Sequence, residues 1–272
     1  MRQLNGWLER VLDREASTRS AALLRIGLAV IAFSRFGSAM MLGPQVGPAQ
    51  ACVIALFWVA TVAMLLGFHA QLATGATVVA MIAAGPIVKA PGWSHHHVSL
   101  LISATALIAF TPCGRSYSLD RWRALARADE RGLPPPAELG RLGMQTLIAV
   151  QLSAVYFWGA FDKCTLGWLR GDKLESQLLF HVFDSDPPDV PGWRALMLVL
   201  AVGTVLLELA LAVGLWLPRA RRWLIPAGIV LHLSIYIALP VTVFSALSCL
   251  LYLAYFDPDE VHRVIDRLSG VA

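Results

Sequence analysis

The residues of this sequence that could carry out chemistry lie in two short stretches. His95, His96 and His97 follow one another directly, and Lys163 ends an apolar run that begins near Gln151. A neutral histidine can accept or donate a proton near neutral pH, and a lysine kept neutral by burial can serve as a base. Successive helical residues point about 100° apart, so three adjacent histidines cannot all face one metal ion. The two stretches therefore favour proton transfer, and we expect no metal.

Each stretch also has a structural interpretation. The histidines open an apolar segment, so they can be polar residues at a helix start that Ser94 caps. Lys163 stands at a helix end, where a lysine commonly extends toward the lipid headgroups, and here it could pair with Asp162. The residue types alone leave both interpretations open.

The composition of the chain indicates which elements must carry these residues. Of the 272 residues, 57% are hydrophobic and 15% are charged, and the mean hydropathy is +0.63. A soluble domain is about 45–50% apolar and about 25% charged. The composition thus excludes a water-soluble enzyme and a disordered chain, and it predicts a protein that crosses the membrane several times. Continuous apolar runs favour helices as the spanning elements.

Eight apolar segments approach the length of about 20 residues that a membrane-spanning helix needs. They are 21–42, 50–67, 71–89, 95–112, 142–163, 195–217, 223–239 and 241–256. We therefore predict an all-α helical bundle of about eight transmembrane helices, forming a single transmembrane domain over 1–272. The other segments are expected to be an interfacial amphipathic helix at 1–18, a cytoplasmic loop at 113–141, a periplasmic loop at 164–194 and a cytoplasmic tail at 257–272.

The arginines and lysines between the apolar segments orient this bundle. Fifteen lie on the side of the two termini and five on the other side. Because cytoplasmic loops are the richer in Lys and Arg, both termini are predicted to be cytoplasmic. The histidines and Lys163 then fall at the same depth on the outer side, with Arg35 near that level. Glu208 and His232 are expected deeper, where they could form a structural pair.

The most specific pattern in the sequence surrounds Lys163. Residues 155–163 read Val-Tyr-Phe-Trp-Gly-Ala-Phe-Asp-Lys, and Trp168 and Gly171 follow. This segment resembles the fingerprint of the HTTM family, the bacterial relatives of the vitamin K-dependent γ-glutamyl carboxylases. In those carboxylases a lysine at this point of a Tyr-Phe-x-x-Gly-x-x-Lys stretch is the base that deprotonates vitamin K hydroquinone, and Lys163 matches it.

Further motifs carry the same resemblance along nearly the whole chain. The family has an Asn-His pair followed by a Ser-x-Asp motif. At that spacing from Ser118-Leu119-Asp120, His97 matches the family histidine and His96 replaces the asparagine. The other positions that fit the pattern are Arg25-Ile26, Glu208, the Arg219–Arg222 cluster, His232 and Phe244-Ser245.

The resemblance implies a vitamin K/menaquinol-type hydroquinone-dependent membrane oxygenase, an epoxidase. Quinol and O2 would be cosubstrates, and quinol oxidation would be coupled to proton abstraction from a peptide or other carbon acid, with CO2 added where carboxylation occurs. The enzyme would lie in the bacterial inner membrane with its site toward the periplasm, and its partners would be lipid, quinol and a peptide on the outer face, with no nucleic acid. The implied site residues are Lys163 and His97 as catalytic groups, and His96, His95, Arg35, Tyr156 and Trp168 as quinol-binding groups.

Two functions of other classes remain open. The first is a non-catalytic membrane partner in export or immunity, which would tolerate loss of Lys163. The second is a small transporter, in which Arg35, Glu208 and His232 would form a relay. Such a transporter would be expected to show an internal repeat, and the sequence shows none that can be defended.

Overall fold

The computed structural model describes residues 15–41, 46–90, 92–183, 188, 190–238 and 242–270. The chain divides into two compact units. Unit 1 comprises Met1–Ile148 and Phe256–Ala272, and unit 2 comprises Ala149–Tyr255. The prediction of a single transmembrane domain stays a prediction.

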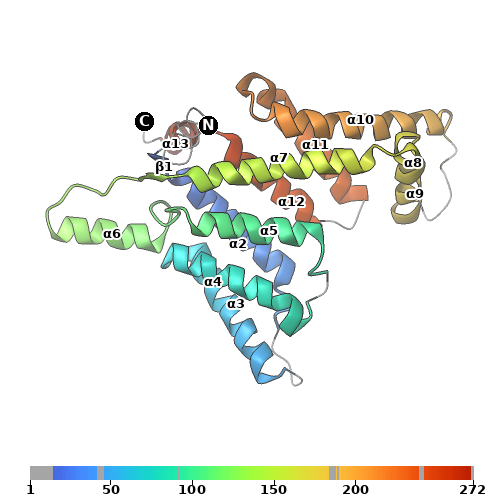
Figure 1. Cartoon of the computed structure of the whole chain (residues 1–272). Helices are drawn as coiled ribbons and strands as arrows, with labels where there is room; N and C mark the ends of the chain where they lie inside the picture. The colour runs from blue at the N-terminus through green and yellow to red at the C-terminus, as the bar shows by residue number, and fades with distance from the viewer. Residues whose placement is uncertain are drawn as a thin grey trace, which may run out of the picture. The chain divides into compact units, whose positions relative to one another are not determined.

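Helices make up nearly all of the regular structure in both units (Figure 1). The elements of unit 1 are β1 (Glu15–Ser17), α2 (Arg19–Phe36), α3 (Pro48–Leu66), α4 (Ala70–Ala83), the π-helix η1 (Ala84–Val88), α5 (His96–Ala109), α6 (Leu119–Glu130), β2 (Leu139–Arg141) and α13 (Pro258–Ser269). Helix α7 (Gly143–Lys163) begins in unit 1 and continues into unit 2. The further elements of unit 2 are α8 (Leu166–Leu169), α9 (Asp172–His181), α10 (Trp193–Gly214), α11 (Pro218–Ala238), α12 (Thr242–Leu251) and the 3-10 helix η2 (Tyr252–Tyr255).

Four of the described helices are long and apolar enough to cross a membrane. They are α3, α4 together with η1, α7 and α10. Helices α2 and α11 have 18 and 21 residues, but each carries three arginines. Helix α5 and the α12–η2 segment are apolar but shorter. The prediction of an all-α membrane protein is thus confirmed apart from the short β1–β2 pair, whereas the count of eight crossings stays a prediction.

The segments outside the apolar runs contain more structure than the sequence suggested. The expected helix at 1–18 lies outside the described residues up to position 14, and Glu15–Ser17 form a strand instead. The expected loop at 113–141 holds α6 and β2, and the expected loop at 164–194 holds α8 and α9. The expected tail at 257–272 holds α13, which Asp257 caps by accepting a hydrogen bond from Asp259 N at 2.9 Å.

One end of unit 1 is organised around the buried side chain of Arg25. Its Nη1 donates to Cys113 O at 2.7 Å and its Nη2 to Tyr117 O at 2.6 Å. Helix α3 ends at Gly67, whose φ of +68° is the left-handed conformation that favours glycine. A Cβ on Gly67 would lie 2.3 Å from Ser118 Cβ and 2.7 Å from Arg25 Nη1. Only a residue without a side chain fits this turn.

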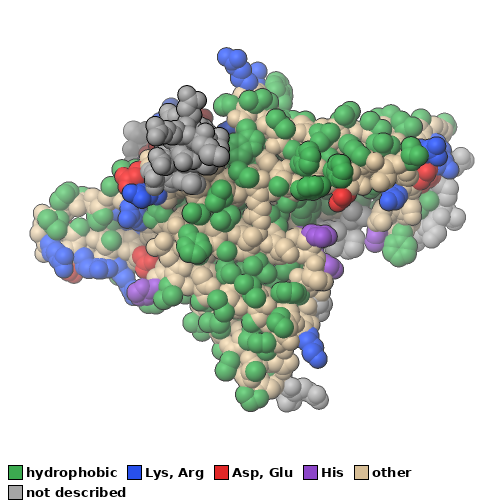
Figure 2. Space-filling view, in the orientation of Figure 1, with side chains coloured by type: hydrophobic (Ala, Val, Ile, Leu, Met, Phe, Trp, Pro, Cys, Tyr) green, Lys and Arg blue, Asp and Glu red, His purple; other side chains and the backbone are tan. Residues whose placement is uncertain are grey.

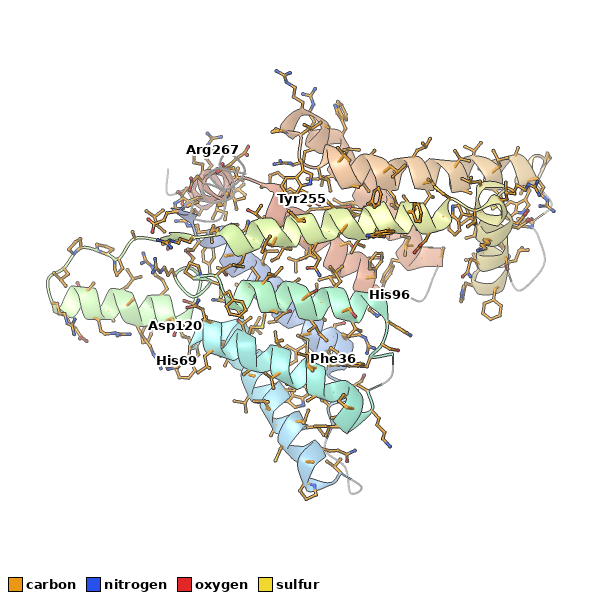
Figure 3. All side chains as sticks on the ribbon, in the orientation of Figure 1. Phe36, His69, His96, Asp120, Tyr255 and Arg267 are labelled. Carbon is orange, nitrogen blue, oxygen red and sulfur yellow. The ribbon has the colours of Figure 1, made fainter. Side chains whose placement is uncertain are left out.

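The Ser-x-Asp motif caps two helices at that same end. Ser118 Oγ accepts from Arg121 N at 2.8 Å and so caps α6. The Asp120 carboxylate accepts from His69 N at 2.9 Å and Ala70 N at 2.8 Å, so it caps α4 from across the turn. Figure 3 shows Asp120 and His69 together at this end of α4, and His96 at the start of α5. In this chain the motif therefore has a structural role, since it caps the starts of α4 and α6.

A small polar junction fixes the C-terminal helix α13 to the start of α2. Strands β1 and β2 pair antiparallel, with Ala16 opposite Gly140. Arg19 Nε donates to Glu138 Oε2 at 2.8 Å, and Arg19 Nη1 pairs with Asp266 on α13. Ser17 Oγ lies 2.7 Å from His262 Nδ1. An ion-pair network therefore joins segments that are far apart in the sequence.

In unit 2, α7 and α10 run alongside each other in opposite directions (Figure 1). Trp216 Nε1, just beyond α10, donates to Ser153 Oγ at 2.8 Å, while Lys163 reaches Glu208. Beyond the end of α7, Trp168 Nε1 donates to Ala201 O at 3.2 Å. Helices α8 and α9 thus pack on the first turns of α10, where α7 no longer reaches.

Candidate active site

Lys163 and Glu208 form a largely buried ion pair in unit 2. Lys163 Nζ lies 3.0 Å from Glu208 Oε1 and 2.9 Å from Oε2. It also donates to Gly159 O at 3.0 Å, one turn back on α7. The side chains are 24% and 9% exposed, respectively. An ammonium has three hydrogens to donate, and here three acceptor oxygens lie within reach.

The pair lies well along the length of α10 rather than at its first turn. Glu208 is fifteen residues after Trp193, the first residue of α10. At 1.5 Å per residue, it lies about 22 Å along that helix from its start. Although Lys163 is the last residue of α7, it therefore sits well inside the length of α10. The expectation that Glu208 lies deeper than Lys163 is corrected, because the two side chains meet.

Two pairings that the sequence left open are not found among the described residues. The hydrogen-bond acceptors of Lys163 are Glu208 and Gly159 rather than the adjacent Asp162. Glu208 does not pair with His232, because His232 Nε2 lies 2.7 Å from the hydroxyl of Tyr156. The side-chain packing decides which faces of two helices meet. That two residues lie on neighbouring helices was therefore not enough to predict the partners of Lys163 and His232.

Tyr156 and His232 belong to a separate buried network of unit 2. The Tyr156 hydroxyl also lies 2.6 Å from the hydroxyl of Tyr252, and the two rings are stacked at 6.4 Å between centroids. His232 is 1% exposed, and its Nδ1 has no hydrogen-bond partner among the described residues. Tyr156 is 3% exposed, so its hydroxyl is engaged inside the protein. The network ties α7, α11 and η2 together one turn or more from Lys163.

The face of α7 next to the ion pair is kept open by Gly159. A Cβ at this position would lie 3.5 Å from Glu208 Oε2 and 3.6 Å from Lys163 Nζ, so it would cover the pair in ordinary contact. The ring of Trp168 lies 5.4 Å from Lys163 Nζ, within the range of a cation–π interaction. The ion pair is therefore bordered by an aromatic ring and by a position without a side chain.

The buried pair has one chemical property that an exposed pair lacks. Two charges in an apolar surrounding are costly unless they are paired and hydrogen-bonded, as they are here. Transfer of one proton from Lys163 Nζ to a Glu208 oxygen removes both charges without any exchange with water. The result is a neutral amine, which is the form a lysine base requires.

The histidine run lies in unit 1 at the start of α5. His95 is the N-cap residue, so the predicted cap at Ser94 is corrected. The rings of His95 and His97 lie 5.3 Å apart, while His96 is exposed. A Cβ on Gly92 would lie 2.8 Å from His95 Cε1 and 3.0 Å from Arg35 Nη2. Arg35 and His95 therefore both border Gly92, and the role of these residues in one site stays a prediction.

Sequence reasoning missed the most informative residue, Glu208 as the partner of Lys163. The available signal was a lone carboxylate in α10, whose mean hydropathy over its most apolar 18 residues is 2.6, the highest among the candidate spans of the described residues. It also missed the packing roles of Gly159 and Tyr252. Because His97 and Lys163 belong to different units, the prediction that they act at one depth stays a prediction.

The comparison with known families supports the resemblance on which these assignments rest. The chain matches the HTTM domain over residues 28–259. The matched range includes the histidine run, Lys163 and Glu208. No curated protein and no solved structure matches the chain.

Proposed function

The chain belongs to the HTTM family, and from that premise we propose that it is a quinol-dependent membrane oxygenase with Lys163 as its base. The HTTM domain is found in vitamin K-dependent carboxylase-like proteins. The observation that supports the proposal is the ion pair of Lys163 and Glu208 beside the open face at Gly159. A lysine that only anchored a helix end would extend toward the headgroups.

In this proposal Lys163 and Glu208 act together as one proton-handling unit. Glu208 takes the proton from Lys163 Nζ, and the neutral amine then accepts the proton of the quinol hydroxyl. The C=O of Gly159 keeps Nζ directed to that side throughout. A base must be unprotonated and within hydrogen-bond reach of the proton it removes. Proton movement inside the pair meets the first requirement without water.

The aromatic cosubstrate defines the remaining roles. A bound vitamin K-type quinol supplies two electrons and the acidic hydroxyl, O2 supplies the epoxide oxygen, and the second oxygen atom leaves as water. Trp168 offers a ring face beside Lys163. From the resemblance, His97, His96, His95 and Arg35 are assigned to orienting the quinol. Tyr156 is assigned a supporting role, because its hydroxyl already bonds His232 and Tyr252.

The strong base produced by quinol oxidation would act on a carbon acid that reaches the site from the outer face of the bacterial inner membrane. A peptide side chain is one such acid, and CO2 would add to the resulting carbanion where carboxylation occurs. The outer location rests on the arginine distribution and on the family resemblance.

The proposal is tested by aerobic incubation of the purified protein with reduced vitamin K or menaquinol, with chromatography for the epoxide. Epoxide formation that depends on O2 and is lost in Lys163→Ala is the expected result. A protein that retains its helical circular dichroism but forms no epoxide with either quinol would favour the non-catalytic membrane partner.

A further inference from the structure

An apolar groove of about 580 Å³ runs along one face of α3 in unit 1. Its floor is formed by Trp58, Val59, Val62 and Leu66, which recur at helical spacing. These four side chains are between 39% and 71% exposed. Helix α3 is one of the helices that can cross a membrane. The groove therefore opens toward the hydrocarbon of the bilayer.

The groove ends where α3 ends, and a positively charged side chain lies at that end. Phe68, which follows the helix, and Leu119 and Arg123 of α6 complete the lining. The Arg123 guanidinium lies 4.5 Å from the centroid of the Phe68 ring. The guanidinium of Arg123 thus lies at the level where the apolar helix α3 ends and polar residues follow. This is the level expected for lipid headgroups.

Helix α6 presents further positive charge beside Arg123. Arg127 lies on the next turn, and its Nε donates to Arg123 O at 3.2 Å. Among the described residues, no carboxylate lies within ion-pair distance of Arg123 or Arg127, whereas Arg121 is paired with Glu138. Trp122 on the same helix is 66% exposed. Figure 2 shows blue side chains gathered along α6 and green ones over α3.

We propose that this groove binds an anionic phospholipid, with one acyl chain along α3 and the phosphate at Arg123. The apolar floor extends over the nine residues 58–66, about 12 Å along the helix, which a free phosphate would not use. Two neighbouring cations without a carboxylate favour a headgroup with net negative charge, since the amine of a zwitterionic headgroup would be repelled by Arg127. A basic helix beside the end of a membrane helix typically recognises anionic lipid.

The test is a lipid titration of the full chain in detergent, followed by native mass spectrometry. Phosphatidylglycerol and phosphatidylcholine are compared for wild type, Arg123→Gln and Val62→Trp. We expect one phosphatidylglycerol to be retained in preference to phosphatidylcholine, with affinity about fivefold lower in Arg123→Gln, as expected for one arginine at a membrane surface. Val62→Trp should fill the groove and also weaken binding, although its surface position leaves the fold unchanged.

The matched control is Arg131→Gln, which removes the same charge at the far end of α6. It should keep at least half of the wild-type affinity. Equal losses in the Arg123 and Arg131 variants would overturn the proposal in favour of diffuse attraction. Unchanged binding in Val62→Trp, equal retention of the two lipids, or displacement of the lipid by millimolar inorganic phosphate would each overturn it as well.

Discussion

At the scale of the residue, the state of Lys163 is set by the groups around its Nζ. All three acceptors are internal: the C=O of Gly159 and the two oxygens of Glu208. An exposed lysine would exchange these partners for water. The enclosed geometry favours a proton that moves within the pair, and it makes Glu208 as important to the proposed chemistry as Lys163.

Replacing Glu208 by Gln should change the pH dependence of the reaction more than its geometry. Glutamine keeps a hydrogen-bond acceptor but cannot take the proton from Lys163 Nζ, so the neutral amine can form only by losing that proton to water. The acid limb of the pH–rate profile should therefore move toward higher pH by about one unit or more. The measurement is epoxide formation against pH.

The control for that variant is Asp162→Asn, which removes a carboxylate adjacent in sequence that does not accept from Lys163. Its profile should match that of wild type. A Glu208→Gln enzyme with an unshifted profile would reduce Glu208 to a packing role.

At the scale of the element, the polar contacts that join neighbouring helices of unit 1 lie at helix ends rather than at helix centres. The α3–α4 turn depends on Gly67, on the Arg25 guanidinium and on the Asp120 cap. The junction of α13 with α2 depends on one arginine shared by two carboxylates. These ends fix how neighbouring helices of unit 1 meet.

Gly67→Ala should destabilise the protein by about 2–4 kcal/mol. The substitution adds the cost of a left-handed backbone to overpacking against Ser118 and Arg25. Gly75→Ala is the matched control, because a Cβ at this position of α4 meets no atom within 4 Å. Thermal unfolding in detergent should show a lower midpoint for Gly67→Ala and an unchanged or higher midpoint for Gly75→Ala. Equal midpoints would contradict the account of this turn.

Docking of α13 should weaken at acid pH. The hydrogen bond from Arg19 lowers the pKa of the Asp266 carboxyl below its ordinary value of 3.8. Because the pKa of Asp266 is lower in the docked state, the ionised carboxylate stabilises the docked helix at pH values above 3.8. This stabilisation is lost as the pH falls through the pKa of the docked state. The protection factors of the α13 amides, which correct for slower intrinsic exchange in acid, should therefore fall below about pH 4. In Asp266→Asn the exchange should already be fast at pH 7, and protection equal to wild type there would refute the role of this pair.

The sequence predicted the positions of the helices better than the contacts between them. Each of the eight apolar runs contains a described helix, because continuous apolar stretches must satisfy their backbone groups internally. The partner of Lys163 was not predicted, since spacing along the chain does not specify which face of α10 meets α7. Helix α6 was not predicted, because its many arginines were taken as typical of a polar loop. The segment is nevertheless an amphipathic helix, and Trp122 lies on its exposed side.

At the scale of the whole molecule, the family match extends across both units. The predicted orientation in the membrane determines which segments of the two units face the cytoplasm and which face the periplasm. With both termini cytoplasmic, α6 faces the cytoplasm and α9 faces the periplasm. Fifteen Lys and Arg residues on one side against five on the other support that orientation.

Cysteine labelling tests the orientation with two exposed positions, Glu130 and Lys173. In a background in which the four native cysteines are replaced by serine, intact cells should admit a membrane-impermeant maleimide to Lys173→Cys but not to Glu130→Cys. Permeabilised cells provide the control in which both positions react. Labelling of position 130 alone in intact cells would reverse the map.

The central claim is that Lys163 is a base, and the most direct measurement compares epoxide formation by Lys163→Arg, Lys163→Ala and wild type across pH. Arginine retains its charge at all accessible pH and can still pair with Glu208, so this variant should unfold near the wild-type temperature. Alanine leaves Glu208 without its cation and should be less stable. If Lys163 removes the quinol proton, both variants lose activity by about 100-fold or more at every pH. An active Lys163→Arg enzyme would contradict the claim.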